Sequence, residues 1–567
     1  MADWLGQATA AWERGDREST IQLSQSAICD NPQDARAYKL LGNGLQASNN
    51  LMSAERAYRC GLNLTSNEER LRGELFANLG GVNQRSGNWE QAVEFYGHAI
   101  AIAPDLMPVY FNWAKGLEER QDFDGAIAVL EKAATSCPMN GTVWLQLGRL
   151  RCEVEDFDGG RRAYEKARQL MLGQAEPLFG LAHVWFYLED FEQAITTGKQ
   201  ALDIDPTSVV GWTNYGVAHY ELGLLDEAER CLERSLALDS SYDDARWALA
   251  NIWLHRGELE RGFEGFEARR SRVLPAPDLP VPEWDGGDLT GKTILVYGQS
   301  GLGDMVQFAR YLPLLQQRGA TVKVAVPKPL VRLLGSMESV EAVERDQGFS
   351  CEALGIDCFT TFLSVPRFFT KSTAEIPQPI PYLSATASDW QPTLPEGDLQ
   401  VGIAWASGKQ NTLDGDRDYR NRSCPLVEMA EALTIPGVTL HALQVGPDAA
   451  ALDSLPENSP VKSWSDSLTD LADTAALMTK LDLVISVDTV VPHLSAALGI
   501  PTWILLPYMP NWRWQLNRDD CDWYPQMRLF RQTAPKNWSE VLEPVRRSLI
   551  KLQEKKHANR TSFSGRN

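Results

Sequence analysis

Basic side chains, paired cysteines and long apolar runs are all scarce in this chain of 567 residues. It has 54 lysine and arginine residues against 75 aspartate and glutamate residues, so its formal net charge is −21 and a nucleic-acid surface is not expected. The nine cysteines are scattered and form no C-x-x-C pair. This argues against a disulfide framework or a zinc site and fits a reducing compartment.

The sequence also shows no pattern typical of a targeting segment or a membrane-spanning segment. The N-terminus has no basic stretch followed by an apolar core, so no signal peptide is predicted. The apolar run near residue 483 is interrupted by Asp488 and His493, and we expect no transmembrane helix. A cytoplasmic protein of three or more domains is therefore expected.

The first half of the chain repeats every 34 residues. Small residues recur in two series, Gly80, Ala114, Gly148, Ala182, Gly216, Ala250 and Ala92, Ala126, Gly160, Ala194, Ala228, Gly262. Small residues let two helices approach closely, and large residues on the same 34-residue spacing fill the gaps between them. The pattern resembles the tetratricopeptide repeat and predicts about eight helix pairs, an all-α solenoid, over residues 1–272. Such solenoids present a concave surface that binds peptides.

One polar position follows the same spacing. Asn78, Asn112, Gln146 and Asn214 fall at one place on the first helix of their repeats, and Gly180 and Ala248 interrupt the series. Amide side chains both donate and accept, so a row of them can pair with an extended peptide backbone. These four residues are our candidates for a peptide-binding face. Amides are also ordinary surface residues at this place.

A connector separates the two halves. Residues 273–291 contain four prolines and three glycines, which predicts a non-helical linker. Residues 286–293 match the P-loop spelling G-x-x-x-x-G-K-T, but the apolar strand follows the lysine, whereas in a P-loop it precedes the glycines. We do not expect nucleotide hydrolysis here.

The second half predicts two α/β lobes. Residues 292–395 alternate short apolar strands with an amphipathic helix, which indicates a parallel sheet, and residues 396–553 repeat the arrangement. Between them, residues 377–398 are rich in proline and look like a hinge. Residues 554–567 are polar and are expected to be disordered.

Two motifs lie at strand-to-helix turns, where parallel sheets bind ligands. The first is G-L-G-D, with Gly301, Gly303 and Asp304. The second is D-T-x-x-x-H, with Asp488, Thr489 and His493, whose helix start offers free N–H groups to a phosphate. Read alone, each motif also fits an ordinary strand–helix junction, and Asp304 fits a helix cap.

Together the two motifs resemble those of the bacterial heptosyltransferases, glycosyltransferase family nine. That resemblance implies a two-lobed GT-B fold with twin Rossmann-like domains, whose C-terminal helix crosses back to the first lobe. It also implies that Asp304 is the catalytic base, beside the acceptor-side loop of Gly301 and Gly303. Asp488, Thr489 and His493 would hold the donor diphosphate. Ser407, Lys409 and Arg422 match the donor-phosphate loop of the family by position, and each also fits a solvated loop.

These observations predict a metal-independent glycosyltransferase without a cofactor. It would move a sugar from a nucleotide-diphosphate sugar to a protein or cell-surface glycan recruited by the solenoid. No cluster of carboxylates has metal-ligand spacing. The arrangement is also similar to that of protein O-linked N-acetylglucosamine transferases, so the sugar stays open. The alternatives are a non-catalytic binding scaffold with a degenerate transferase domain, and another two-lobed nucleotide-sugar enzyme such as an epimerase.

Overall fold

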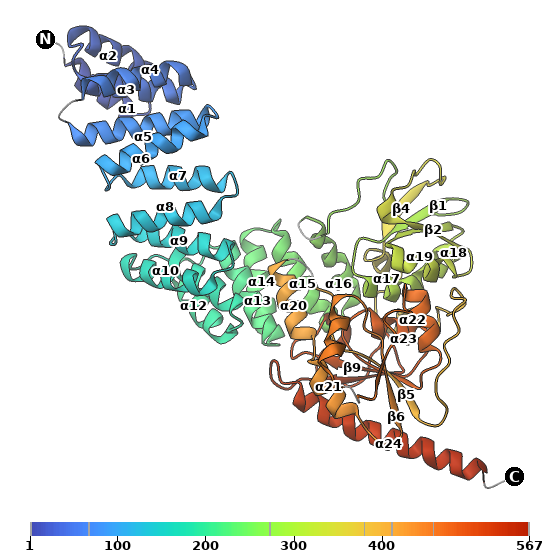
Figure 1. Ribbon diagram of the computed structural model, residues 1–567. Helices are drawn as coiled ribbons and strands as arrows, with labels where there is room; N and C mark the ends of the chain where they lie inside the picture. The colour runs from blue at the N-terminus through green and yellow to red at the C-terminus, as the bar shows by residue number, and fades with distance from the viewer. Residues whose placement is uncertain are drawn as a thin grey trace. The chain divides into compact units, whose positions relative to one another are not determined.

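The computed structural model describes residues 3–65, 68–271, 274–378, 380–409, 412–456 and 459–564. The chain divides into two compact units, Met1–Asn214 and Tyr215–Asn567, and each is described by itself. The helices of the first unit and the sheets of the second can be followed in Figure 1. Within the ranges described, every helix is too short or too polar to cross a membrane.

The first unit is built from helix pairs. Its helices are α1 (Trp4–Glu13), α2 (Arg17–Asp30), α3 (Ala35–Ala47), α4 (Leu51–Leu64), α5 (Glu69–Arg85), α6 (Trp89–Ile102), α7 (Met107–Glu118), α8 (Phe123–Ser136), α9 (Gly141–Glu153), α10 (Phe157–Leu170), α11 (Glu176–Tyr187) and α12 (Phe191–Ile204). Each odd-numbered helix packs against the even-numbered helix that follows. The predicted repeating pair of helices is confirmed.

Aspartates start three of the second helices. Asp122, Asp156 and Asp190 recur every 34 residues and precede α8, α10 and α12. Each side chain accepts a hydrogen bond from the backbone N–H three residues on. A cap of this kind satisfies a donor that the helix leaves unpaired and contributes about 1 kcal/mol. The spacing therefore sets helix starts as well as packing.

The recurring glycines receive aromatic rings from the partner helix. A Cβ atom built on Gly80 would lie 2.5 Å from the Tyr96 ring, and one on Gly148 would lie 2.9 Å from the Tyr164 ring. Tyr96 is fully buried, and its hydroxyl donates to Gln84 Oε1 at 2.7 Å. These contacts explain why the sequence keeps glycine at this place.

The second unit starts inside the seventh repeat. It takes in the end of α13 (Val209–Glu221), then α14 (Leu225–Leu238), α15 (Asp243–His255), α16 (Leu259–Gly265) and the 3₁₀ turn η1 (Phe266–Ser271). Leu254, Leu259 and Phe263 share one buried cluster with Ile294 and Val296 of the first α/β lobe. The last repeat and that lobe therefore pack as one body, although the sequence suggested a boundary at residue 272.

The connector after the repeats is non-helical in its described part, as predicted, but it is packed. Trp284 and Leu289 are buried, and Glu283 pairs with Arg270 at 2.5 Å. Residues 272 and 273 lie outside the described residues. Thr293, the last residue of the P-loop-like segment, is the first residue of strand β1. The strand thus follows the segment, whereas in a P-loop it precedes the glycines.

The first lobe has a four-stranded parallel sheet in the order β3-β2-β1-β4. Its elements are β1 (Thr293–Tyr297), α17 (Leu302–Phe308), η2 (Ala309–Tyr311), α18 (Leu312–Gln317), β2 (Thr321–Val326), α19 (Lys328–Gly335), β3 (Val340–Glu344), η3 (Arg345–Gln347), β4 (Cys358–Thr361), η4 (Val365–Phe368) and η5 (Thr373–Glu375). Apolar residues fill β1 and β2 because helices cover a parallel sheet.

The second lobe has six parallel strands in the order β10-β9-β8-β5-β6-β7. Its elements are β5 (Leu399–Ala404), α20 (Leu413–Arg422), α21 (Leu426–Leu433), β6 (Val438–Ala442), η6 (Pro447–Ser454), β7 (Val461–Ser463), α22 (Leu471–Met478), β8 (Leu483–Val487), α23 (Val490–Ala497), β9 (Thr502–Leu506), η7 (Trp512–Trp514), β10 (Met527–Arg531) and α24 (Ser539–Ser564). This is the Rossmann order, and its switch point lies between β5 and β8. The α/β class is confirmed.

The C-terminal segment differs from the prediction in two ways. The helix α24 continues to Ser564, so residues 554–564, expected to be disordered, are helical. It also packs against α21 and β10 of its own lobe instead of crossing back to the first. Lys556 pairs with Asp482 at 2.5 Å. The described side chains from Gln553 to His557 are polar, and that ion pair attaches this part of the helix.

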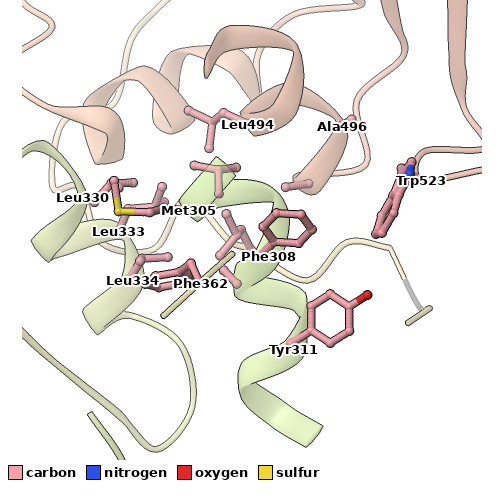
Figure 2. Close-up of a cluster of buried hydrophobic side chains, with 14 of the residues drawn as sticks. Met305, Phe308, Tyr311, Leu330, Leu333, Leu334, Phe362, Leu494, Ala496 and Trp523 are labelled. Carbon is pink, nitrogen blue, oxygen red and sulfur yellow. The ribbon is translucent and has the colours of Figure 1, made fainter. Parts of the chain in front are cut away.

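One hydrophobic core runs through both lobes (Figure 2). Met305, Phe308 and Tyr311 of the first lobe lie in one cluster with Leu494 and Trp523 of the second. The segment predicted as a hinge is part of this packing, since the Tyr382 N–H donates to the Ala497 carbonyl at 3.1 Å. The two lobes therefore share a hydrophobic core.

Candidate functional site

Two helix starts, one from each lobe, meet beside the predicted motifs. Helix α17 follows β1 and carries Asp304 in its first turn, while α23 follows β8 and carries His493, and the two helices pack together. A Cβ atom on Gly303 would lie 2.9 Å from His493 Cδ2. The second glycine of G-L-G-D is needed because a larger residue would hold the two helices apart.

Asp304 forms an ion pair with a residue that the sequence analysis did not select. Arg513 Nη2 donates to Asp304 Oδ1 at 2.5 Å, and Arg513 also donates to Gln307 Oε1 and, at 2.8 Å, to Asn511 Oδ1. The Arg513 side chain is buried, whereas Asp304 keeps 27% of its side-chain surface exposed. The carboxylate is thus held in place and still accessible. A Cβ atom built on Gly301, the N-cap of α17, would meet only Asp304 Oδ2, at an ordinary contact distance of 3.6 Å.

His493 is buried and held by two aromatic residues. Its Nδ1 shares a hydrogen bond of 3.1 Å with the Tyr524 hydroxyl, and its ring lies against Trp514. Burial, with the charge of Arg513 nearby, holds the His493 pKa well below its ordinary value of 6.5. The imidazole is therefore neutral at physiological pH. A neutral ring bonded at Nδ1 keeps Nε2 for another partner.

Asp488 lies next to His493, with 4.0 Å between Asp488 Oδ1 and His493 Nε2. Burial raises the Asp488 pKa above its ordinary value, and the charge of Arg422 opposes that shift. Arg422 Nη1 donates to the Asp488 backbone carbonyl at 3.5 Å. Thr489 is the N-cap of α23, but its side chain makes no capping hydrogen bond. Asp304, Arg422, Asp488, Thr489 and His493 thus gather at one place.

The loop after β5 supplies a second group. The Ser407 backbone N–H donates to Ser423 Oγ at 3.2 Å, next to Arg422 in sequence. Lys409 instead points away, since its side chain is 58% exposed and its Nζ lies 3.5 Å from Asp416 Oδ1. Of the three predicted loop residues, the structure brings Ser407 and Arg422 towards the site and leaves Lys409 at the surface.

A cavity of about 390 Å³ opens at the carboxyl ends of β5 and β6. Its wall includes Trp405, Tyr419, Ser423 and Asp448. The Tyr419 hydroxyl donates to Asp448 Oδ1 at 2.5 Å across the rim. Sequence pattern alone does not reveal this cavity, because Trp405 directly follows an apolar strand and Tyr419 lies in a polar segment.

Three buried polar atoms beside this cavity lack a hydrogen-bond partner among the described residues: Trp405 Nε1, Ser407 Oγ and Arg422 Nε. Trp405 and Ser407 are almost fully buried. An unsatisfied buried polar group costs about 1–3 kcal/mol, so several at one place favour a site that a polar ligand completes.

Another buried histidine lies away from these residues. His441 of β6 bonds through Nε2 to Gln400 Oε1 at 2.7 Å, and Trp464 Nε1 donates to His441 Nδ1 at 3.0 Å. Burial lowers the His441 pKa to about 4. Among the described residues, no group of His, Cys, Asp and Glu side chains is arranged to hold a metal ion.

The predicted amide series is only partly available. Asn112 and Asn214 are exposed, but the Asn78 side chain donates to Asn43 Oδ1 at 3.0 Å, and Gln146 accepts from Arg149 at 3.2 Å. The Tyr58 hydroxyl also donates to Asn43 Oδ1, at 2.9 Å. Half of the series therefore already serves contacts within the solenoid.

Comparison with known proteins identifies the repeats. The family model described as tetratricopeptide repeat matches residues 216–269. A curated relative, "Protein FlbA" of Caulobacter vibrioides (strain ATCC 19089 / CIP 103742 / CB 15), is 24% identical over 563 residues, covering 93% of this chain and 86% of its own. The chain therefore carries tetratricopeptide repeats, a type that forms protein-interaction surfaces.

Solved structures with some similarity include MamA, 18% identical over 28% of this chain and 92% of that one, with a TM-score of 0.26. The Cut9–Hcn1 hetero-tetramer of the APC/C is 17% identical over 48% of this chain and 53% of that one, with a TM-score of 0.31. A tetratricopeptide repeat protein from Parabacteroides merdae is 15% identical over 42% of this chain and 93% of that one, with a TM-score of 0.34.

Proposed function

We propose that this chain is a glycosyltransferase of GT-B architecture that binds a nucleotide-diphosphate sugar in its second lobe and modifies an acceptor recruited by the repeats. The observation that carries the proposal is the group of unsatisfied polar atoms at Trp405, Ser407 and Arg422, beside a cavity at the carboxyl end of β5. The crevice at these strand ends is where Rossmann-type sheets bind nucleotides.

We propose that the donor binds to the second lobe. The cavity would take the planar base, since Trp405 and Tyr419 line it. The diphosphate would extend towards Arg422, Thr489 and the N–H groups at the start of α23, which favour negative charge. Neutral His493 would donate from Nε2 without adding charge. No metal is proposed, because arginines supply the positive charge.

The acceptor would enter on the side of Asp304. Its hydroxyl oxygen attacks the anomeric carbon, the new C–O bond forms, and the bond from that carbon to the diphosphate oxygen breaks. The departing diphosphate takes the bonding electron pair, and Asp304 takes the hydroxyl proton. Arg513 keeps the Asp304 carboxylate oriented through Oδ1, and Arg422 offsets the charge that develops on the diphosphate.

A second candidate function is a binding scaffold whose transferase domain is inactive. The observation that favours it is the ion pair between Asp304 and Arg513, which occupies one oxygen of the proposed base. In that case nucleotide would bind without sugar transfer, and the repeats would carry the function.

The experiment separates the two functions. The full chain is incubated with adenosine, uridine and guanosine diphosphate sugars, with and without candidate acceptor proteins. Release of nucleoside diphosphate and acceptor mass are then measured. We expect Asp304→Asn to abolish transfer with little change in nucleotide affinity, because the base acts on the acceptor. Asp346→Asn, an exposed aspartate of the same lobe paired with Arg345, is the control. Nucleotide binding without turnover by the wild-type chain would favour the scaffold.

The repeats are tested separately. The triple change Asn78→Ala, Asn112→Ala and Asn214→Ala should reduce transfer to protein while donor hydrolysis stays unchanged, at a stability cost near 0.5 kcal/mol for each site. Unchanged transfer would show that the amides do not recruit the acceptor.

A further inference from the structure

We infer that the seventh repeat positions the nucleotide site through helix α20, by means of an ion pair between Glu221 and Arg417. The inference rests on the proposed function. Glu221 is the last residue of α13, and Arg417 lies in the middle of α20, whose Tyr419 lines the cavity. Arg417 Nη2 lies 3.1 Å from Glu221 Oε1.

Polar contacts hold much of helix α20 in place. Its sequence, LDGDRDYRNR, has no apolar stripe that would seat it on a core. Thr412 caps its start by accepting from the Gly415 N–H at 3.0 Å. Its contacts with other elements include those of Arg417, Tyr419 and Arg422, and the Tyr419 ring also packs against the core of the second lobe. A helix held in this way shifts when one of its contacts is lost.

The three side chains connect the repeat to the site. At 100° per residue, Arg417 and Tyr419 project to nearly opposite sides of the helix. Arg417 meets Glu221 of the repeat, while Tyr419 donates to Asp448 at the cavity rim. Arg422, one turn on, donates to the Asp488 carbonyl at the end of β8. A movement of Glu221 relative to the sheet would therefore change both the rim and the phosphate end.

The same turn of the seventh repeat has a second attachment to the lobe. The Tyr508 hydroxyl donates to the Leu222 carbonyl at 3.4 Å, and Tyr508 follows β9. The side chains of Arg417 and Glu221 are only 11% and 18% exposed, so water screens their attraction weakly. The repeat is thus attached to α20 through Glu221 and to the loop after β9 through the Leu222 carbonyl.

The test uses the full chain and the variants Glu221→Gln and Arg417→Lys. Glutamine keeps the shape of the side chain and removes its charge. The matched control is Glu227→Gln, a glutamate of the same repeat that pairs with Arg230 within α14. Affinity for ADP, UDP and GDP is measured by calorimetry, and hydrogen exchange of residues 412–423 is measured without nucleotide. Thermal unfolding verifies that each variant is folded.

We expect Glu221→Gln to weaken the best nucleotide by between about threefold and about thirtyfold and to speed exchange in α20. Glu227→Gln should change neither, and Arg417→Lys should fall between the two. Equal affinity and equal exchange in Glu221→Gln and Glu227→Gln would overturn the inference. A wild-type chain that binds none of the three nucleotides would refute the proposed function instead. In that case, faster exchange in Glu221→Gln than in Glu227→Gln would support only the statement that the ion pair holds α20 in place.

Discussion

Replacing Gly303 by alanine tests whether the close contact of α17 with α23 shapes the site. The added Cβ atom would lie 2.9 Å from His493 Cδ2, 3.5 Å from His493 Nε2 and 3.6 Å from Val490 Cα. Carbon atoms normally approach to about 3.5–4.0 Å, so the first contact is too short by more than about 0.6 Å. The imidazole has little freedom to move away, because Tyr524 holds its Nδ1.

Strain of this kind in a packed region costs about 1–3 kcal/mol. Alanine gains about 0.5–1 kcal/mol over glycine inside a helix, which offsets part of the cost. We expect a net loss of about 1 kcal/mol, which lowers the melting temperature of the second unit by about 1–2 °C. Sugar transfer should fall at least about tenfold, since a displacement near 1 Å of reacting groups costs up to about a hundredfold.

Gly301→Ala is the matched control from the same loop. Its Cβ atom would have only Asp304 Oδ2 nearby, at 3.6 Å, and its φ of −63° suits any residue. Scanning calorimetry and the transfer assay should show this variant within about 0.5 kcal/mol of wild type and fully active. If Gly303→Ala behaved like Gly301→Ala in both assays, the contact would not be what positions the site.

Three further outcomes are expected. Gly80→Ala should destabilise the first unit by about 1–3 kcal/mol in thermal unfolding because its Cβ meets a buried ring, whereas Gly97→Ala, with nothing within 4 Å, should stabilise it; equal effects would refute this packing argument. Tyr524→Phe keeps the ring and removes the hydroxyl that fixes His493, so transfer should fall while melting temperature changes little. Burial lowers the pKa of His441 from 6.5 to about 4, so the folded state binds a proton at this ring less readily than the unfolded state. The stability that neutral His441 contributes should be fully present above pH 6.5 and should decrease by up to about 3 kcal/mol towards pH 4. Thermal unfolding at several pH values should show that His441→Asn flattens this dependence.

Local patterns in the sequence were sufficient for much of the fold. The 34-residue series that runs through Gly80, Ala114 and Gly148 indicated the helix pairs, since each repeat buries its small residues in the same way. The segment from Leu483 to Gly499 predicted β8 and α23, because its first residues are apolar and Gly499 ends the helix. Asp488 and His493 could be selected for the same reason, as both lie within one short segment.

Contacts between distant segments could not be predicted in this way. Arg513 meets Asp304 from 209 residues away, and no periodicity links the two positions. No sequence pattern indicates that the Tyr524 hydroxyl reaches His493. Lys409 matched the donor loop by position, but the chain turns it towards Asp416. Residue type and spacing suggest candidates, and only the packing of the two lobes decides which of them face one another.

The burial of Leu254, Leu259 and Phe263 in the core of the first lobe changes how the repeats can be handled as modules. Repeat arrays ordinarily need a terminal helix with a polar outer face to remain in solution. Here the α/β lobe covers that end, so the eighth repeat has kept an apolar outer face. Repeats nearer the N-terminus can in principle be exchanged, but a fragment ending at residue 271 would expose these three side chains and should aggregate unless a polar cap were added.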